Sequence, residues 1–235
     1  VKDFGLPLSY PEAYQLVLDG LAPLGEDYVA KLKEAYDGGW IDVYPSEGKS
    51  SGAFSEGAIQ RVHPYVKLNH VNNLSSASTI AHELGHAMHS YFSNENQPYA
   101  KADYSLFVAE VASTCNEAIM SRFLLEKYDD PKAQAAILDE MMEKYRPTVY
   151  RQTMFAEFEC IAHDMAAAGE PLTQEALNKA YYDLNVKYYG EGCVVDDFIA
   201  YEWMRIPHFY RAFYVYVYAT GFCAAMALSH RILTE

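Results

Sequence analysis

Hydrophobic residues recur every three to four positions along most of the chain, which is the period of helices that bury one face. The pattern starts after Ser9, where Pro11 suits a first helical turn, and pauses at Gly38 and Gly39, which favour a helix end. From Leu74 onward it returns. The pattern predicts helices over residues 9–21, 26–36, 76–92, 105–127, 131–168, 173–189, 196–204 and 210–233.

The stretch between the second and third of these helices has a different pattern. The segments "WIDVYPSEGKSSGAFSEG" and "VHPYVKLNH" combine Gly, Ser and Pro with short alternating or β-branched runs. Such runs indicate two or three short strands joined by loops. Because the chain has no internal repeat and no low-complexity linker, we expect a mainly α fold, a single domain over residues 1–235 built around a small β-sheet.

Composition narrows the classes of partner. The 235 residues are 51% hydrophobic, and 18 Lys and Arg against 32 Asp and Glu give a formal net charge of −14. This charge would repel a phosphate backbone, so no nucleic-acid partner is expected. The absence of a leader-like segment and of a long apolar run predicts a cytoplasmic protein without a membrane partner. The four cysteines lie far apart, which favours reduced thiols, and the oligomeric state stays open.

The segment "STIAHELGHAMHSYF", residues 78–92, carries the candidate chemistry. On a helix, His82 and His86 are one turn apart and project the same way, so two imidazole nitrogens can reach one metal ion beside Glu83. These side chains lie among apolar neighbours, where burial without partners would be costly and a metal would remove that cost. His89 lies about 10.5 Å along the axis from His82, too far to ligate the same ion.

The third ligand should therefore come from another helix. In "SLFVAEVAST", Glu110 interrupts an apolar run, and a cation beside such a carboxylate would keep it ionised. Glu110 is the first candidate. Glu117 lies on the same helix face and is the main competitor, although it is better placed to accept the second N–H of a ligating histidine.

Two histidines and one carboxylate leave one position of a zinc ion open, which predicts hydrolysis. Glu83 would take a proton from a water whose pKa the zinc lowers, and would pass it to the leaving amine. Zinc is preferred over cobalt or manganese by ligand type and availability. Two alternatives remain: a metal-binding chain without turnover, and a zinc hydrolase acting on another amide.

Three separated motifs, "AHELGHAMHSYFSN", "FVAEVASTCNEA" and "RIPHFYRAFYVYVYATG", resemble the oligoendopeptidase F family of thimet-oligopeptidase-like zinc metallopeptidases. The resemblance covers nearly the whole chain. It implies a zincin-like catalytic lobe, one zinc ion and cleavage of short peptides, with His82, His86 and Glu110 as ligands and Glu83 as the catalytic glutamate. Because family members are longer, the chain is expected to be a catalytic-lobe fragment without the N-terminal lobe and the C-terminal end.

The resemblance also implies that His208 and the tyrosines after it help to stabilise the tetrahedral intermediate. On a continuous helix, Tyr210, Tyr214 and Tyr218 would share a stripe, whereas Tyr216 would point away. Tyr214 is the first candidate and Tyr218 the second. The alternative is that these tyrosines form an amphipathic face packed against the core.

The predicted strands offer a place for a peptide. An edge strand formed by "SSGAFS" could hydrogen-bond an extended peptide backbone, and the alternative is a buried scaffold strand. Arg205 and Arg211 could pair with a substrate carboxylate, but ordinary surface ion pairs are the default expectation.

Overall fold

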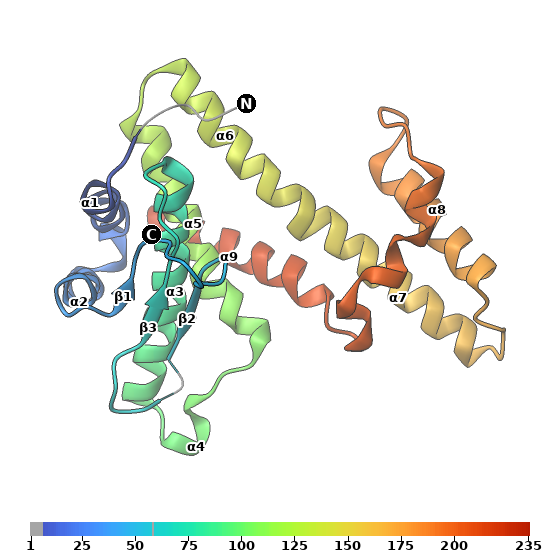
Figure 1. Ribbon diagram of the computed structural model, residues 1–235, viewed down its shortest axis with the longest axis horizontal. Coiled ribbons are helices and arrows are strands. Elements are labelled where there is room, and N and C mark those ends of the chain that lie inside the picture. The colour runs from blue at the N-terminus through green and yellow to red at the C-terminus, as the bar shows by residue number, and fades with distance from the viewer. Residues whose placement is uncertain (1–6, 58) are drawn as a thin grey trace. The chain divides into compact units, whose positions relative to one another are not determined.

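The computed structural model describes residues 7–57 and 59–235 (Figure 1). They form two compact units, the first reaching to Met141 and including Gly221–Glu235, and the second spanning Met142–Thr220. The predicted single domain over 1–235 also includes residues 1–6 and 58, which lie outside the described residues. Whether the two units act as one catalytic domain stays a prediction.

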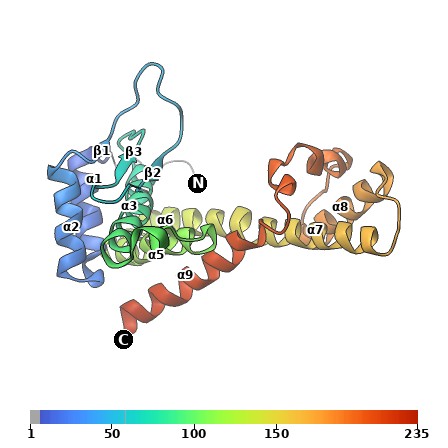
Figure 2. The same ribbon diagram turned by 90° about the horizontal axis from the view of Figure 1, so that it is seen from below.

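The first unit begins with two packed helices, α1 (Tyr10–Gly20) and α2 (Glu26–Asp37), joined by a short 3-10 turn. Figures 1 and 2 show α1 and α2 side by side. The carboxylate of Glu12 accepts a hydrogen bond of 2.9 Å from the backbone N–H of Ser9, which satisfies an otherwise unpaired donor at the start of α1. Both helices lie close to the limits that the sequence pattern predicts.

A small sheet follows. Its order is β1-β3-β2, from β1 (Ile41–Asp42), β2 (Phe54–Glu56) and β3 (Tyr65–Lys67). β1 runs parallel to β3, and β2 runs antiparallel to it with Ser55 opposite Val66. β2 is thus an edge strand of this sheet, but only Phe54 and Ser55 of the "SSGAFS" segment belong to it, and the strand is not buried. The mainly α fold with a small sheet is confirmed.

The centre of the first unit is the pair α3 (Leu74–Asn96) and α5 (Leu106–Lys127). Asn73 caps α3 by accepting a hydrogen bond of 2.8 Å from Ser76 N–H. A Cβ atom on Gly85 of α3 would lie 2.6 Å from the Cα atom of Ser113 on α5. Only glycine therefore allows this approach of the two helices. A short helix between them, α4 (Tyr99–Ala102), was not predicted.

The helix predicted over 131–168 is interrupted. The structure has α6 (Pro131–Tyr145), a wider π segment at Arg146–Tyr150, and α7 (Arg151–Ala167). Pro147 has no N–H to donate, and its ring would clash with the carbonyl four residues earlier. Widening the turn relieves that clash.

In the second unit, α8 (Gln174–Tyr189) packs against α7, and the 3-10 segment η3 (Asp197–Arg205) packs against α8. The segment predicted as a helix over 196–204 is thus a 3-10 helix instead. Trp203 Nε1 donates a hydrogen bond of 2.8 Å to Asn178, which ties η3 to α8. The core of this unit combines aromatic and aliphatic side chains: Met154, Phe155, Phe158, Tyr181, Leu184, Ile206 and Val215.

The last predicted helix begins later than expected. A 3-10 segment, η4 (Pro207–Tyr210), precedes a turn, and the helix α9 runs over Tyr216–Thr234 rather than 210–233. Phe213 has a φ of 53°, which a right-handed helix cannot contain. The expectation that Tyr210, Tyr214 and Tyr218 share one helical stripe is therefore wrong.

The sequence predicts no membrane-spanning helix and no disulfide bonds. Within residues 7–57 and 59–235, no helix combines the length and apolar character needed to cross a bilayer. The four cysteines, Cys115, Cys160, Cys193 and Cys223, are free thiols.

Candidate metal centre

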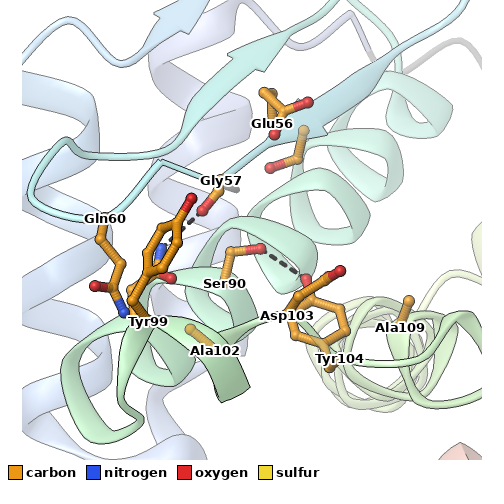
Figure 3. A pocket seen from close by; sticks show the side chains of 11 residues that line it. Glu56, Gly57, Gln60, Ser90, Tyr99, Ala102, Asp103, Tyr104 and Ala109 are labelled. Atoms are coloured by element: carbon orange, nitrogen blue, oxygen red, sulfur yellow. Dashed lines mark hydrogen bonds between the residues drawn. The ribbon is translucent and has the colours of Figure 1, made fainter.

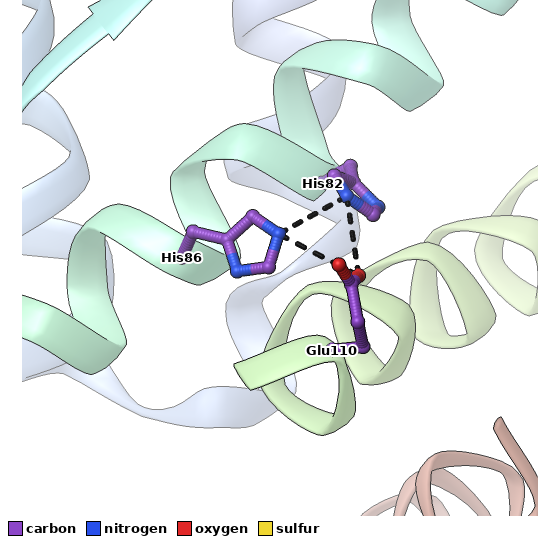
Figure 4. A group of neighbouring side chains, drawn as sticks. All are labelled: His82, His86 and Glu110. Atoms are coloured by element: carbon purple, nitrogen blue, oxygen red, sulfur yellow. Dashed lines mark hydrogen bonds and ion pairs between the residues drawn. The ribbon is translucent and has the colours of Figure 1, made fainter. Parts of the chain in front are cut away.

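Three predicted ligands meet between α3 and α5. Figure 4 shows the rings of His82 and His86 and the carboxylate of Glu110 converging on one point. The two Nε2 atoms are 3.2 Å apart, and Glu110 Oε2 lies 3.6 Å from each of them. Ligand atoms of a tetrahedral zinc ion, at bonds of about 2.0–2.1 Å, are about 3.3 Å apart. The donor set thus fits zinc without rearrangement.

Further side chains of α5 hold these ligands in place. Glu117 Oε1 lies 3.4 Å from Nδ1 of His82, the nitrogen that faces away from the cluster. Ser113, fully buried, donates a hydrogen bond of 3.1 Å to Glu110 Oε2, and Asn116 Nδ2 donates one of 3.0 Å to the Ala81 carbonyl. Sequence reasoning placed Glu117 but missed Ser113 and Asn116. The sequence does show two polar residues in an apolar helix, three and six positions after Glu110, and these are Ser113 and Asn116.

Glu83 lies beside the cluster in a desolvated setting. Its side chain is buried, and its Oε2 atom has no hydrogen-bond partner within the described part of the chain. Burial raises the pKa of Glu83 to about 6. The charge of His82 lowers this pKa, and the charges of Glu110 and Glu117 raise it further. A carboxylate with this pKa can both accept and release a proton near neutral pH.

The two histidines differ in their electrostatic surroundings. Burial alone would lower the pKa of His82, but Glu117, by hydrogen bond and charge, and then Glu110 and Glu83 outweigh it and raise that pKa. Burial, followed by the charge of His82, lowers the pKa of His86. The difference follows from Glu117, which lies 3.4 Å from His82, whereas Glu110 lies 3.6 Å from both rings.

His89 does not join the cluster, as expected from its distance along the helix. Its ring stacks on Tyr104 at 3.7 Å between centroids with an interplanar angle of 11°, and burial lowers its pKa. The Tyr104 hydroxyl and Ser90 Oγ form a hydrogen bond of 2.6 Å. His89 is thus a packing residue that holds Tyr104.

A cavity of about 710 Å³ lies between β2, α3, α4 and α5, and none of His82, His86 and Glu110 lines it. Figure 3 shows Tyr99 and Gln60 on one side of it, and Asp103 and Tyr104 on the other. Ser90, one turn after His86, also lines the cavity, as does Ala109, the residue before Glu110. The described residues that line it include carboxylates, hydroxyls and amides but no Lys or Arg.

The remaining predicted site residues belong to the second unit, where they form a ring cluster of His208, Tyr214 and Tyr218. The rings of His208 and Tyr214 are nearly parallel, with 6.0 Å between centroids and an interplanar angle of 7°. The hydroxyls of Tyr214 and Tyr218 are 2.9 Å apart, although only Tyr218 lies on α9. Tyr210, the third tyrosine of the predicted stripe, is 89% exposed.

The two arginines considered for substrate binding have intramolecular partners. Arg205 forms an ion pair of 2.5 Å with Glu202, which is buried, so the expected surface ion pair has only one exposed partner. Arg211 lies with its guanidinium carbon 4.7 Å from the centre of the Tyr214 ring, a cation–π contact rather than an ion pair.

Two imidazoles from one HExxH helix and a carboxylate from a second helix, with a buried glutamate beside them, are an arrangement typical of metallopeptidases. Residues 4–235 match Peptidase family M3, and the chain belongs to this family. It is 52% identical over 235 residues to Oligopeptidase PepF of Bacillus subtilis (strain 168), covering 100% of this chain and 35% of that protein. It is 44% identical over 225 residues to the chromosomal Oligoendopeptidase F of Lactococcus lactis subsp. cremoris, covering 96% of this chain and 37% of that protein.

Solved structures agree with this assignment. A crystal structure from Chlamydophila abortus matches with a TM-score of 0.88 and 42% identity, over 97% of this chain and 38% of that one. The crystal structure of oligoendopeptidase-F from Enterococcus faecium matches with a TM-score of 0.69 and 36% identity, over 97% of this chain and 34% of that one. The chain thus spans between 34% and 38% of the length of these relatives.

Proposed function

We propose that this chain forms the zinc-binding catalytic part of an endopeptidase that hydrolyses short oligopeptides. The observation that carries the proposal is the cluster of His82 Nε2, His86 Nε2 and Glu110 Oε2, separated by 3.2 to 3.6 Å, with buried Glu83 beside it. Membership of Peptidase family M3 and the similarity to Oligopeptidase PepF and Oligoendopeptidase F support the substrate class.

His82, His86 and Glu110 would hold the zinc ion. Their side chains remain 26%, 18% and 31% exposed, so a substrate carbonyl can reach the ion. When bound, zinc supplies Lewis acidity that polarises the carbonyl and lowers the pKa of water. Glu117 supports this arrangement by holding Nδ1 of His82, which leaves Nε2 for the ion.

Glu83 moves the proton. Its carboxylate takes a proton from the attacking water and then donates it to the nitrogen of the leaving amine. Burial raises the pKa of Glu83 above its ordinary value, which makes the carboxylate a better proton acceptor, and a cation beside it would favour the ionised form before attack.

The substrate backbone would run along β2. An edge strand can hydrogen-bond an extended peptide without reading its side chains, which suits cleavage of varied short peptides. The ring cluster of His208, Tyr214 and Tyr218 would donate hydrogen bonds to the developing oxyanion, each worth about 3 kcal/mol.

The test combines zinc content with cleavage of a quenched fluorogenic peptide, for the unmutated chain and for Glu83→Gln. We expect one zinc per chain in both and a loss of turnover in the variant of about 10²- to 10⁴-fold. Glu95→Gln changes an exposed glutamate of the same helix and should affect neither quantity. Zinc bound without any turnover by the unmutated chain would favour the metal-binding alternative, and absence of zinc would overturn the proposal.

A further inference from the structure

The turn before α9 has an unusual backbone conformation. Phe213 adopts a φ of 53°, in the left-handed region, which is unfavourable for a bulky side chain. Such a conformation persists only where surrounding groups hold it. Tyr214, the next residue, carries one of the three rings of the ring cluster.

One buried carboxylate holds this backbone. Glu159, on α7, is 5% exposed, and its Oε1 atom accepts a hydrogen bond of 2.7 Å from the N–H of Phe213. Hydrogen bonds to an ionised acceptor are stronger than those between neutral groups.

The same helix also contacts the Phe213 side chain. The ring of His163 lies 4.5 Å from the ring of Phe213 between centroids, at an interplanar angle of 41°. Nδ1 of His163 lies 2.8 Å from the backbone carbonyl oxygen of Glu159, one turn earlier on α7. α7 thus holds both the backbone and the side chain of Phe213.

We propose that Glu159 is a positioning residue whose carboxylate fixes the Phe213 turn and thereby the mutual arrangement of His208, Tyr214 and Tyr218. The Tyr214 hydroxyl meets Tyr218 at 2.9 Å, and its ring lies parallel to His208, so a change of backbone direction at Phe213 would separate these groups. The consequence for catalysis rests on the proposed function. The positioning itself does not.

The direct test is hydrogen exchange of the Phe213 amide, measured by NMR on the whole chain. Glu159→Leu removes the acceptor at similar volume, whereas Glu159→Gln keeps an acceptor oxygen. We expect exchange at least about 10-fold faster in the Leu variant, since the amide loses its bond, and a much smaller change in the Gln variant. Glu157→Gln, on the same helix but bonded to Lys187 and Tyr188, is the matched control and should leave Phe213 unchanged. Unchanged exchange in a folded Leu variant would overturn the proposal.

A second variant covers the case in which Glu159→Leu does not fold. Glycine adopts positive φ without strain, so Phe213→Gly in the Glu159→Leu background should restore folding if the carboxylate serves to hold the left-handed backbone. Failure of the double variant to recover would contradict that role.

Kinetics then separate positioning from catalysis. Glu159→Leu should lower kcat with little change in KM, because the rings act on the transition state, and Glu159→Gln should recover most of the loss. In a Tyr214→Phe background the Leu substitution should have little further effect on kcat. If Tyr214→Phe alone leaves kcat unchanged, the catalytic role of the ring cluster fails, while the exchange result still decides the role of Glu159.

Discussion

Glu110 and Glu117 are the same residue type on one face of α5, yet their carboxylates contact different atoms. Glu110 Oε2 lies 3.6 Å from Nε2 of both His82 and His86, whereas Glu117 Oε1 lies 3.4 Å from Nδ1 of His82 alone. The first position suits a ligand and the second suits a group that orients one.

We therefore expect the two carboxylates to differ in their effect on zinc affinity. Glu117→Gln should weaken binding by about 10- to 100-fold, the usual effect of removing a partner of a ligating histidine, and Glu110→Gln by more than that. Competition with a chelator measures both. Glu126→Gln, an exposed glutamate of α5 paired with Arg122, should leave affinity unchanged. A greater loss of zinc affinity in Glu117→Gln than in Glu110→Gln would mean that Glu117 is the ligand and Glu110 the orienting group.

At the scale of single residues, helical spacing carried the prediction of the metal cluster. His82 and His86 share a face because they are four residues apart, and Glu110 was conspicuous among apolar neighbours. Ser113 and Asn116 could not be assigned in the same way, because serine and asparagine occur in helices for many reasons. Only the packing of α5 against α3 reveals what their polar atoms bind.

At the scale of elements, the contact of α3 with α5 depends on Gly85. Gly85→Ala would place Cβ 2.6 Å from the Cα atom of Ser113 and 3.0 Å from the Ala112 oxygen, both in the backbone. Because backbone cannot rotate away, we expect the helices to separate, at a cost of about 1–3 kcal/mol in the free energy of unfolding and with weaker zinc binding.

Urea unfolding and chelator competition check this prediction together. Gly192→Ala is a suitable control, because a Cβ there would meet nothing within 4 Å and its φ is not positive. An unchanged unfolding free energy in Gly85→Ala would mean that the two helices are not held at the observed separation.

Glu202 connects three elements of the second unit. Its carboxylate, buried on η3, accepts hydrogen bonds of 2.7 Å from both Arg151 and Tyr181. Burial alone would raise the pKa of Glu202, but these hydrogen bonds and the charges of Arg151 and Arg205 outweigh it and lower that pKa. The ionised form therefore stabilises the unit.

Glu202→Gln should thus destabilise the second unit, by about 1–3 kcal/mol at pH 7, because it leaves the guanidinium of Arg151, whose side chain is 25% exposed, without its counter-charge. A lowered pKa contributes stability above the ordinary glutamate pKa of about 4.3 and loses it as the pH falls through the folded-state value. The difference between the variant and the parent should therefore shrink below about pH 4. Urea midpoints across this pH range measure it, with exposed Glu191→Gln as control, and a pH-independent difference would contradict the linkage.

Most helices were predictable from hydrophobic period, because a buried face repeats over many residues. The observed helices deviate from the predicted ones where a single residue imposes a different backbone conformation. Pro147 widens one turn between α6 and α7, and Phe213, held by Glu159, delays the start of α9. A phenylalanine gives no local signal for positive φ, since its conformation is imposed by a carboxylate 54 residues earlier.

At the scale of the whole molecule, each unit has its own buried core and one of the two tryptophans. Trp40 is buried in the first unit, and Trp203 is anchored to Asn178 in the second. Fluorescence of single-tryptophan variants therefore reports each unit separately.

We expect the two units to unfold in urea with different midpoints. In Trp203→Phe, the remaining Trp40 signal should shift with Gly85→Ala and not with Glu202→Gln. In Trp40→Phe, the remaining Trp203 signal should shift with Glu202→Gln and not with Gly85→Ala. Equal shifts of both signals with either substitution would show one cooperative structure instead.

The close contact at Gly85 has a consequence for how HExxH sequences are interpreted. The pentapeptide "HELGH" supplies two nitrogen donors and a base, and its glycine also admits the neighbouring helix that delivers the oxygen donor. A chance occurrence with a bulkier residue at this place would keep the partner helix, and with it the carboxylate, at a greater distance. The missing Cβ atom of Gly85 thus distinguishes an HExxH sequence that can form a site of this geometry from one that occurs by chance.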